Sequence, residues 1–218
     1  MPSATVDTTD TRQRLLDAAG KVFAEKGFRS ATIREICKRA KANVAAVNYH
    51  FGDKERFYAE VLGYAHRCAL EKYPPHLGLA ETATAEERLT AFVRSFLLRV
   101  LDNGRPAWHG KLMLREMAEP TAALDRLVEE SIRPNLDLLR SIVTDLLGDA
   151  ATDDDVRASA SSIVAQCLFY YQCRPVITRL NPQQSYDPAA IDRLADHITR
   201  FSLGGLRHRA EERRRERS

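Results

Sequence analysis

Residues 32–54 read TIREICKRAKANVAAVNYHFGDK, and they carry the strongest structural signal in the chain. Ser30 or Thr32 can cap a short helix, which a break ending at Asn43 interrupts. Asn43 can in turn cap a second short helix that runs through His50. Apolar residues at helical spacing can form a small core that fixes the angle between the two helices: Ile33, Ile36, Ala40, Val47 and Phe51. This pattern predicts a helix-turn-helix, in which the second helix lies in the major groove of DNA.

Helical patterns continue on both sides of this motif, and the sequence gives almost no sign of strands. Residues 11–25 carry one apolar stripe, and Gly27 is a natural end for that helix. Pro134 lies inside a long helical stretch, where we expect a kink. The other helices are expected over residues 54–72, 84–102, 106–118, 121–147, 152–173 and 187–203, with a stop at Asn103-Gly104. The predicted fold class is all-α, with a three-helix N-terminal head followed by a larger helical bundle.

Charge is uneven along the chain, although the formal net charge is only +3. Residues 11–60 contain 11 Lys and Arg against 6 Asp and Glu, whereas residues 61–204 contain 16 against 19. A basic head on a mildly acidic body indicates a polyanionic partner such as DNA. A solvated, charge-rich surface would give the same balance, so charge alone leaves both interpretations open.

Composition disfavours several classes of protein. With 44% hydrophobic and 29% charged residues, the chain is typical of globular proteins. It has no run of about 18 apolar residues and no signal-peptide pattern near its start, so we expect no membrane partner and a cytoplasmic location. The four cysteines lack metal-binding spacing and are expected to be reduced.

Catalytic motifs are missing from the sequence. No glutamate is followed by histidine at the third position, as a di-iron bundle would need. The sequence also lacks a G-x-S-x-G elbow, a Walker loop and a G-x-G dinucleotide turn. We therefore expect a protein that is not an enzyme and that uses neither a cofactor nor a metal.

As an ordered set, residues 11–60 resemble the TetR family of bacterial transcriptional regulators. The strings that carry the resemblance are LLDAA (15–19), FAEKGF (23–28), TIREI (32–36), AKANV (40–44) and VNYHFGDKE (47–55). The chain departs from the family at Lys41-Ala42, where Gly-Val is common, and at Asn48, where many members carry Tyr. We expect Lys41 to accept the backbone geometry of the glycine at a small cost in stability.

The resemblance implies which residues read DNA. Asn48 can bridge adenine N6 and N7, and the alkyl groups of Val44 and Ala45 can contact thymine methyl groups. Residues expected at DNA are Thr32, Arg34, Asn43, Val44, Ala45, Asn48, Tyr49, His50 and Lys54. Among them, Arg34 can reach a guanine or a phosphate, while Thr32, Tyr49, His50 and Lys54 are expected at phosphates. Tyr49 and His50 can also be plain packing residues, and the sequence leaves this alternative open.

The resemblance also divides the chain into a DNA-binding domain (11–56), a ligand-binding and dimerisation domain (57–204) and a basic tail (205–218) that is expected to be frayed. Residues expected at the ligand are Phe96, Trp108, His109, Met113, Arg115, Met117, Tyr170 and Arg174. Residues expected at the dimer interface are Ile163, Leu168, Leu194, Ile198 and Phe201. For both sets, the alternative is that the residues belong to the protein's own core.

Together, these features predict a repressor that binds a palindromic operator in double-stranded DNA as a homodimer and is released by a small-molecule inducer of unknown identity. The strings around Asn48 and Trp108, with Arg115-Glu116-Met117, resemble one branch of the family that is associated with export or drug-sensitivity genes. The alternative is a helical adaptor or small-molecule-binding protein with only nonspecific affinity for DNA.

Overall fold

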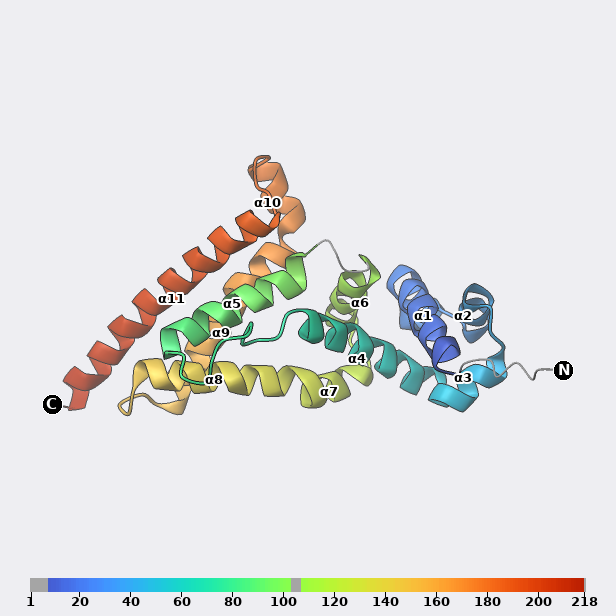
Figure 1. Ribbon diagram of the computed structural model, residues 1–218, viewed down its shortest axis with the longest axis horizontal. Coiled ribbons are helices and arrows are strands. Elements are labelled where there is room, and N and C mark those ends of the chain that lie inside the picture. Colours follow the sequence, from blue (N-terminus) through green and yellow to red (C-terminus); the bar gives the residue numbers. More distant parts are fainter. Residues whose placement is uncertain (1–7, 103–106, 218) are drawn as a thin grey trace. The chain divides into compact units, whose positions relative to one another are not determined.

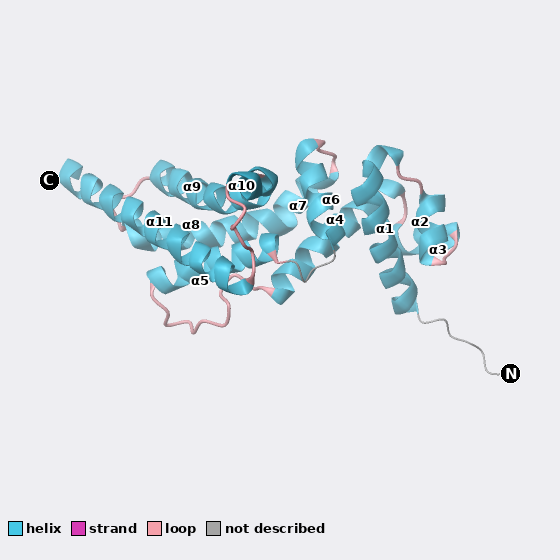
Figure 2. Cartoon of the chain, turned by 90° about the horizontal axis from the view of Figure 1, so that it is seen from above, coloured by secondary structure: helices cyan, strands magenta, loops and turns pink. Residues whose placement is uncertain are grey.

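The computed structural model describes residues 8–102 and 107–217, and this part of the chain consists of helices and connecting loops only (Figures 1 and 2). The predicted all-α class is therefore confirmed. The predicted stop at Asn103-Gly104 and the start of a helix at residue 106 lie outside the described residues.

The chain forms two compact units. Among the described residues, the N-terminal unit comprises 8–68 and 107–132, and the C-terminal unit comprises 69–102 and 133–217. The N-terminal unit contains α1 (Thr8–Ser30), α2 (Ile33–Ala40), α3 (Val44–Phe51), most of α4 (Lys54–Lys72), α6 (Ala107–Ala118), α7 (Ala123–Leu127) and the π-helical turn η1 (Val128–Ile132). The C-terminal unit contains α5 (Ala85–Leu101), α8 (Arg133–Leu147), α9 (Asp153–Gln172), α10 (Arg174–Leu180) and α11 (Pro188–Arg217).

A continuous apolar core holds the N-terminal unit together. Leu15, Leu16 and Phe23 of α1 are fully buried, and they share a core cluster with Ile36 of α2 and Val47 of α3. Full burial of each such side chain contributes about 1.5–3 kcal/mol to the free energy of folding. The core that was predicted for the helix-turn-helix is thus present, and α1 and α4 complete it.

Gly27 ends the regular part of α1, as the sequence predicted. Its φ of +77° lies in the left-handed region, which a residue with a Cβ adopts only at a cost. A Cβ at this position would also lie 2.7 Å from Nη1 of Arg115. Gly27 therefore allows the chain to turn sharply towards the cap of α2.

The C-terminal unit is a bundle in which α5, α8, α9 and α11 pack against one another (Figure 1). Its core contains Leu97 of α5, Val143 of α8, Ile163 of α9 and Ile198 of α11, all almost completely buried. Helix α5 begins with a capping box, in which the backbone N–H of Glu87 donates to Oγ1 of Thr84 and the Glu87 carboxylate accepts from the backbone N–H of Thr84.

Two irregularities differ from the sequence prediction, and both involve proline. The expected kink at Pro134 is replaced by the π-helical turn η1 just before it, between α7 and α8. Proline has no N–H to donate to the preceding turn, so the chain widens there. Helix α10, which follows the boundary at Cys173, is not among the expected helices, and Pro175 occupies its first turn, where no N–H is needed.

Helix α11 is longer than the sequence indicated. We expected it to reach at least Leu203 and residues 205–218 to form a frayed tail, but the helix continues through both glycines to Arg217. Two contacts explain the difference. Leu206 and Ala210 are buried in the core of the C-terminal unit, and Arg209 and Arg213 pair with Asp155 of α9. Tertiary contacts of this kind override the weak helix propensity of glycine.

Candidate nucleic-acid interface

The turn between α2 and α3 is closed by Lys41 in a left-handed conformation, with φ of 51° and ψ of 46°. The N–H of Lys41 donates to the carbonyl of Lys38 at 3.4 Å, and the N–H of Ala42 donates to the carbonyl of Cys37 at 3.0 Å. This pair of hydrogen bonds is a Schellman motif, which satisfies the last carbonyl groups of a helix. Lys41 therefore accepts the glycine-like geometry, as predicted from the departure at this position.

Both helices of the motif begin with the predicted side-chain caps. Oγ1 of Thr32 accepts a hydrogen bond from the N–H of Glu35 at 3.3 Å, and Oδ1 of Asn43 accepts from the N–H of Ala46 at 2.8 Å. These caps satisfy N–H groups that have no partner within the helix. Thr32 and Asn43, both expected at DNA, thus already use their side-chain oxygens within the protein.

Helix α3 has one buried face and one exposed face. Val47 and Phe51 are 1% and 6% exposed, and they pack in the core of the N-terminal unit. The opposite face presents four residues, all expected at DNA and all exposed: Val44, Ala45, Asn48 and Tyr49. Their spacing of one and four residues places them on one side of a helix. Val47 and Phe51 therefore anchor the helix in the core, while its outer side chains remain available for contact with base edges.

The residues expected at phosphates have different surroundings. Tyr49 is 80% exposed, and Arg34 is also exposed. His50 is half-buried, and its ring centre lies 5.0 Å from that of Tyr49 and 5.9 Å from that of Phe51. His50 therefore packs against its neighbours as well as reaching the surface, so the packing alternative applies to it in part.

Lys54 is held by two residues that the sequence did not single out as functional. Its Nζ donates a hydrogen bond to the carbonyl of Arg29 at 3.3 Å and lies 4.8 Å from the centre of the Phe28 ring. A cation over an aromatic face is attracted by the ring quadrupole. No local sequence signal could have shown these contacts, because Lys54 lies 25 residues after Arg29.

Part of the positive charge of the head is neutralised internally. Arg39 pairs with Glu25 at 2.8 Å and with Glu35 at 3.1 Å, and Lys26 pairs with Glu35 at 2.7 Å. The hydrogen bond from Lys26, together with the charges of Lys26 and Arg39, lowers the pKa of the Glu35 carboxyl. Arg39 thus braces α2 against α1 although it is exposed, as Arg34, Lys38 and Lys41 also are.

Residues expected at the ligand fall into two groups. Five lie on α6 of the N-terminal unit, where Trp108 and His109 are buried, Met113 and Arg115 are half-buried, and Met117 is exposed. Three lie in the C-terminal unit: Phe96 and Tyr170 are half-buried against its core, and the Arg174 guanidinium lies 4.5 Å from the centre of the Tyr186 ring. Neither unit alone brings all eight residues together.

Residues expected at the dimer interface are divided between core and surface. Ile163, Leu194 and Ile198 are at most 9% exposed and belong to the core of the C-terminal unit, so their side chains have little surface left for a second chain. The apolar stripes of α9 and α11 thus contribute to the unit's own packing, and contact of these three residues with a second chain stays a prediction. Leu168 is half-buried and Phe201 is 68% exposed, so these two residues still offer surface.

Two kinds of feature are absent from the described residues. No helix in residues 8–102 and 107–217 is long and apolar enough to cross a membrane. The same residues contain no group of three or more His, Cys, Asp or Glu side chains placed to hold a metal ion.

The fold and the exposed recognition helix define a DNA-binding transcriptional regulator, and comparisons with known proteins agree. Residues 15–61 match the model of the bacterial regulatory proteins of the tetR family. Residues 85–206 match the C-terminal domain of the HTH-type transcriptional dual regulator CecR. The chain belongs to the TetR family of transcriptional regulators, with a C-terminal domain of the CecR type. Its members are regulators and not enzymes, as the sequence predicted.

Individual relatives show how far the similarity extends. The dual regulator CecR of Shigella flexneri is 28% identical over 177 residues, which cover 78% of this chain and 79% of CecR. The transcriptional repressor NicS of Pseudomonas putida is 33% identical over 90 residues, which cover 41% of this chain and 42% of NicS. The crystal structure of AibR in complex with isovaleryl coenzyme A and operator DNA has the same fold, with a TM-score of 0.63 and 18% identity over 87% of this chain and 96% of AibR.

Proposed function

We propose that this regulator is a repressor that binds a palindromic operator as a homodimer and leaves the operator when a small-molecule inducer binds. The observation that carries this proposal is the outer face of α3, which exposes Val44, Asn48 and Tyr49 while Val47 and Phe51 anchor the helix. An exposed, rigidly held helix of this kind fits the major groove of DNA. We propose that it acts in the cytoplasm, where operator DNA lies.

Individual roles follow from side-chain chemistry. The Asn48 amide can accept from N6 of adenine through its oxygen and donate to N7 through its nitrogen, which gives a bidentate pair. Val44 and Ala45 present methyl groups to thymine. Arg34 can donate to a guanine or a phosphate, and Asn43 can use its amide N–H groups, because only its Oδ1 caps the helix. Thr32, Tyr49, His50 and Lys54 position the helix on phosphates without reading sequence.

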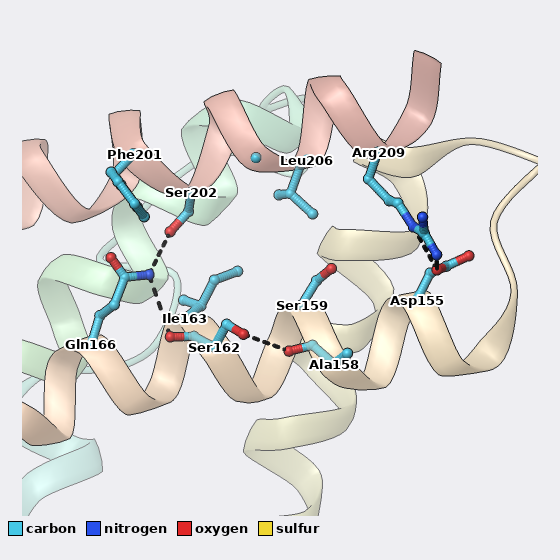
Figure 3. A pocket seen from close by; sticks show the side chains of 11 residues that line it. Asp155, Ala158, Ser159, Ser162, Ile163, Gln166, Phe201, Ser202, Leu206 and Arg209 are labelled. Atoms are coloured by element: carbon cyan, nitrogen blue, oxygen red, sulfur yellow. Dashed lines mark hydrogen bonds and ion pairs between the residues drawn. The ribbon is translucent and has the colours of Figure 1, made fainter. Parts of the chain in front are cut away.

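A surface between α9 and α11 supports the proposed dimer. The two helices enclose a groove of about 330 Å³, lined largely by small residues that include Ala158, Ser159, Ser162 and Gly205. Figure 3 shows Phe201 towards one end of this groove and the pair of Asp155 and Arg209 towards the other. Small residues allow close approach of a second chain, and an exposed aromatic ring is a typical anchor of an interface.

Known relatives support the remaining parts of the proposal. NicS is named a repressor and CecR a dual regulator, and the AibR structure contains both a coenzyme A thioester and operator DNA. We propose a small-molecule inducer on this basis. We also propose export or drug-sensitivity genes as targets, because residues 48–52 resemble the branch of the family that is associated with such genes. An inducer acts only through a difference in its affinity for the DNA-bound and free states.

Selection of DNA from a random duplex pool tests the function, because such a pool requires no assumption about the operator sequence. We expect enrichment of a palindrome whose half-sites are one helical turn or a multiple apart. The selected site should bind at least about a thousandfold more tightly than bulk DNA, and affinity should fall steeply with salt. Equal binding to all sequences would instead favour an adaptor or small-molecule-binding protein that keeps only nonspecific affinity for DNA.

A further inference from the structure

A second cavity lies within the N-terminal unit, close to the start of the helix-turn-helix. Its volume is about 440 Å³. The lining residues come from the segment after Gly27, from α4, and from the end of α6 with the loop that follows it: Phe28, Arg29, Tyr58, Arg115, Glu119, Pro120 and Thr121. The volume is sufficient for a small organic molecule.

The inner wall of this cavity is fixed by a buried hydrogen-bond network. The Tyr58 hydroxyl donates to Oε2 of Glu116 at 2.7 Å, and Glu116 is fully buried. Oε1 of Glu116 accepts from the N–H of Thr121 at 2.8 Å and from its hydroxyl at 3.0 Å. Burial and the Glu116 carboxylate raise the pKa of Tyr58, which therefore remains a neutral donor. A wall held in this way needs little rearrangement when a ligand binds.

The lining of the cavity carries two basic residues and one acidic residue, and the buried carboxylate of Glu116 lies behind Tyr58 and Thr121. Two guanidinium groups, those of Arg29 and Arg115, line it together with one carboxylate, that of Glu119. Nη2 of Arg115 donates only a long hydrogen bond of 3.4 Å to the carbonyl of Glu25. Within the part of the chain that the structure describes, neither arginine forms an ion pair. The guanidinium groups are thus available for an anion, and guanidinium and carboxylate groups match in geometry.

Two residues that line the cavity also hold the side chain of Lys54, which is expected at DNA. Phe28 and Arg29 line the cavity, and they are also the two residues that hold the Lys54 ammonium. The rings of Phe28 and Tyr58 pack with their centres 5.0 Å apart and form an aromatic wall. A negative charge in the cavity would therefore lie next to the part of the head that we expect at phosphates.

We propose that this cavity binds a small aromatic carboxylate, and that the bound anion weakens the affinity of the head for DNA. The carboxylate pairs with Arg115 and Arg29, and the aromatic ring packs against Phe28 and Pro120. The bound charge offsets part of the positive potential that attracts DNA phosphates. The effect on DNA rests on the proposed function, whereas binding of the ligand does not.

Calorimetric titration of the full chain with benzoate tests the site, with neutral benzamide as the matched ligand. We expect a dissociation constant for benzoate of about 1 mM and much weaker binding of benzamide. R115Q should weaken benzoate binding about tenfold, because it removes a charge-assisted hydrogen bond. E119Q should strengthen binding, because it removes the opposing charge. K111Q is the control, since Lys111 is exposed on the same helix and does not line the cavity.

An unfolded variant would lose benzoate binding for the wrong reason, so the melting temperature of each variant is measured alongside. R29Q provides a second test of the site, at an exposed residue. The site is refuted if benzoate shows no saturable binding below about 50 mM. It is equally refuted if folded R115Q and R29Q both bind benzoate as the parent does, or if benzamide binds as well as benzoate.

Fluorescence anisotropy with a labelled duplex of random sequence tests the coupling. Saturating benzoate should reduce DNA affinity about fivefold at 0.1 M salt, as expected for the loss of about one phosphate contact, and benzamide should not. Binding of benzoate without any change in DNA affinity would overturn the coupling. If the chain bound no DNA at all, the proposed function would fail, while the titration would still decide whether the site exists.

Discussion

Gly20 of α1 lies against the indole ring of Trp108 on α6, so closely that a Cβ on Gly20 would overlap the ring carbon Cε3. Trp108 is 6% exposed and shares the core cluster of the N-terminal unit. Its ring is therefore part of the packing between α1 and α6. This contact explains why an aromatic residue that was expected at the ligand is needed for the fold.

Gly20→Ala should lower the free energy of unfolding by about 1–3 kcal/mol, because the added methyl group overlaps a buried ring that has little room to move. Chemical denaturation measures the change. Gly204→Ala is the matched control, since a Cβ there meets no atom within 4 Å and α11 should gain about 0.5–1 kcal/mol. Equal effects of the two substitutions would contradict the close packing of Gly20 on the indole ring.

Lys41→Gly should stabilise the protein by about 0.5–1 kcal/mol, because glycine adopts the positive φ of 51° without strain. Thermal or chemical denaturation measures the gain. The control is Lys38→Gly inside α2, which should cost about 1 kcal/mol while removing the same charge. Destabilisation by Lys41→Gly would show that the left-handed conformation carries no strain.

Asn48→Ala and Lys54→Ala should weaken DNA binding in different ways. Asn48→Ala is expected to relax the choice of base at one operator position, at a cost of about 1–3 kcal/mol on the preferred site. Lys54→Ala is expected to weaken binding to all sequences alike and to reduce the salt dependence by about one counterion. Anisotropy on the selected operator and on its single-base variants separates these outcomes. A uniform loss for Asn48→Ala would exclude it from base readout.

Phe201→Ser should raise the dissociation constant of the proposed dimer at least about tenfold, because an exposed aromatic anchor contributes about 2 kcal/mol or more. Analytical ultracentrifugation over a range of concentrations measures the change. Leu138→Ser on α8 is the control, since Leu138 is another exposed apolar residue of the C-terminal unit. A dimer that tolerates Phe201→Ser must use a different surface.

The stability of the C-terminal unit should depend on acidic pH through Asp155. Hydrogen bonds from Arg213, Thr152 and Arg209 hold the pKa of this carboxyl well below its ordinary value of 3.8. A group with a lowered pKa in the folded state stabilises the fold above its unfolded pKa, and this contribution is lost as the pH falls below that value.

Asp155→Asn should therefore lower the melting temperature at neutral pH and flatten its decline below about pH 5. The control is Asp154→Asn, since Asp154 is an exposed neighbour in the same first turn of α9. Parallel pH profiles for Asp155→Asn and the parent chain would show that the interaction of Asp155 with the arginines does not set the acid stability.

Local signals in the sequence were sufficient to predict most helix starts. Thr32, Asn43 and Thr84 cap their helices through contacts within three residues, so each start can be predicted from adjacent side chains. The outer face of α3 was predictable for a similar reason, because the helical period separates Asn48 and Tyr49 from the anchoring residues.

Long-range contacts could not be predicted in this way. The continuation of α11 depends on Asp155, which lies 54 residues before Arg209. An apolar stripe such as that containing Ile163 and Ile198 does not reveal whether its partner is the same chain or a second copy. The contact of Trp108 with Gly20 likewise joins segments that are distant in the sequence.

The two caps of the helix-turn-helix complicate any mutational scan of this region. An alanine at Thr32 or Asn43 removes a cap worth about 1 kcal/mol together with whatever the side chain does at DNA. A weakened gel shift would then mix partial unfolding with lost recognition. Asn43→Ser keeps a capping oxygen but lacks the amide N–H groups, so it reports recognition while the helix start remains intact, and Thr32→Ser, which keeps both the cap and the hydroxyl, is its control.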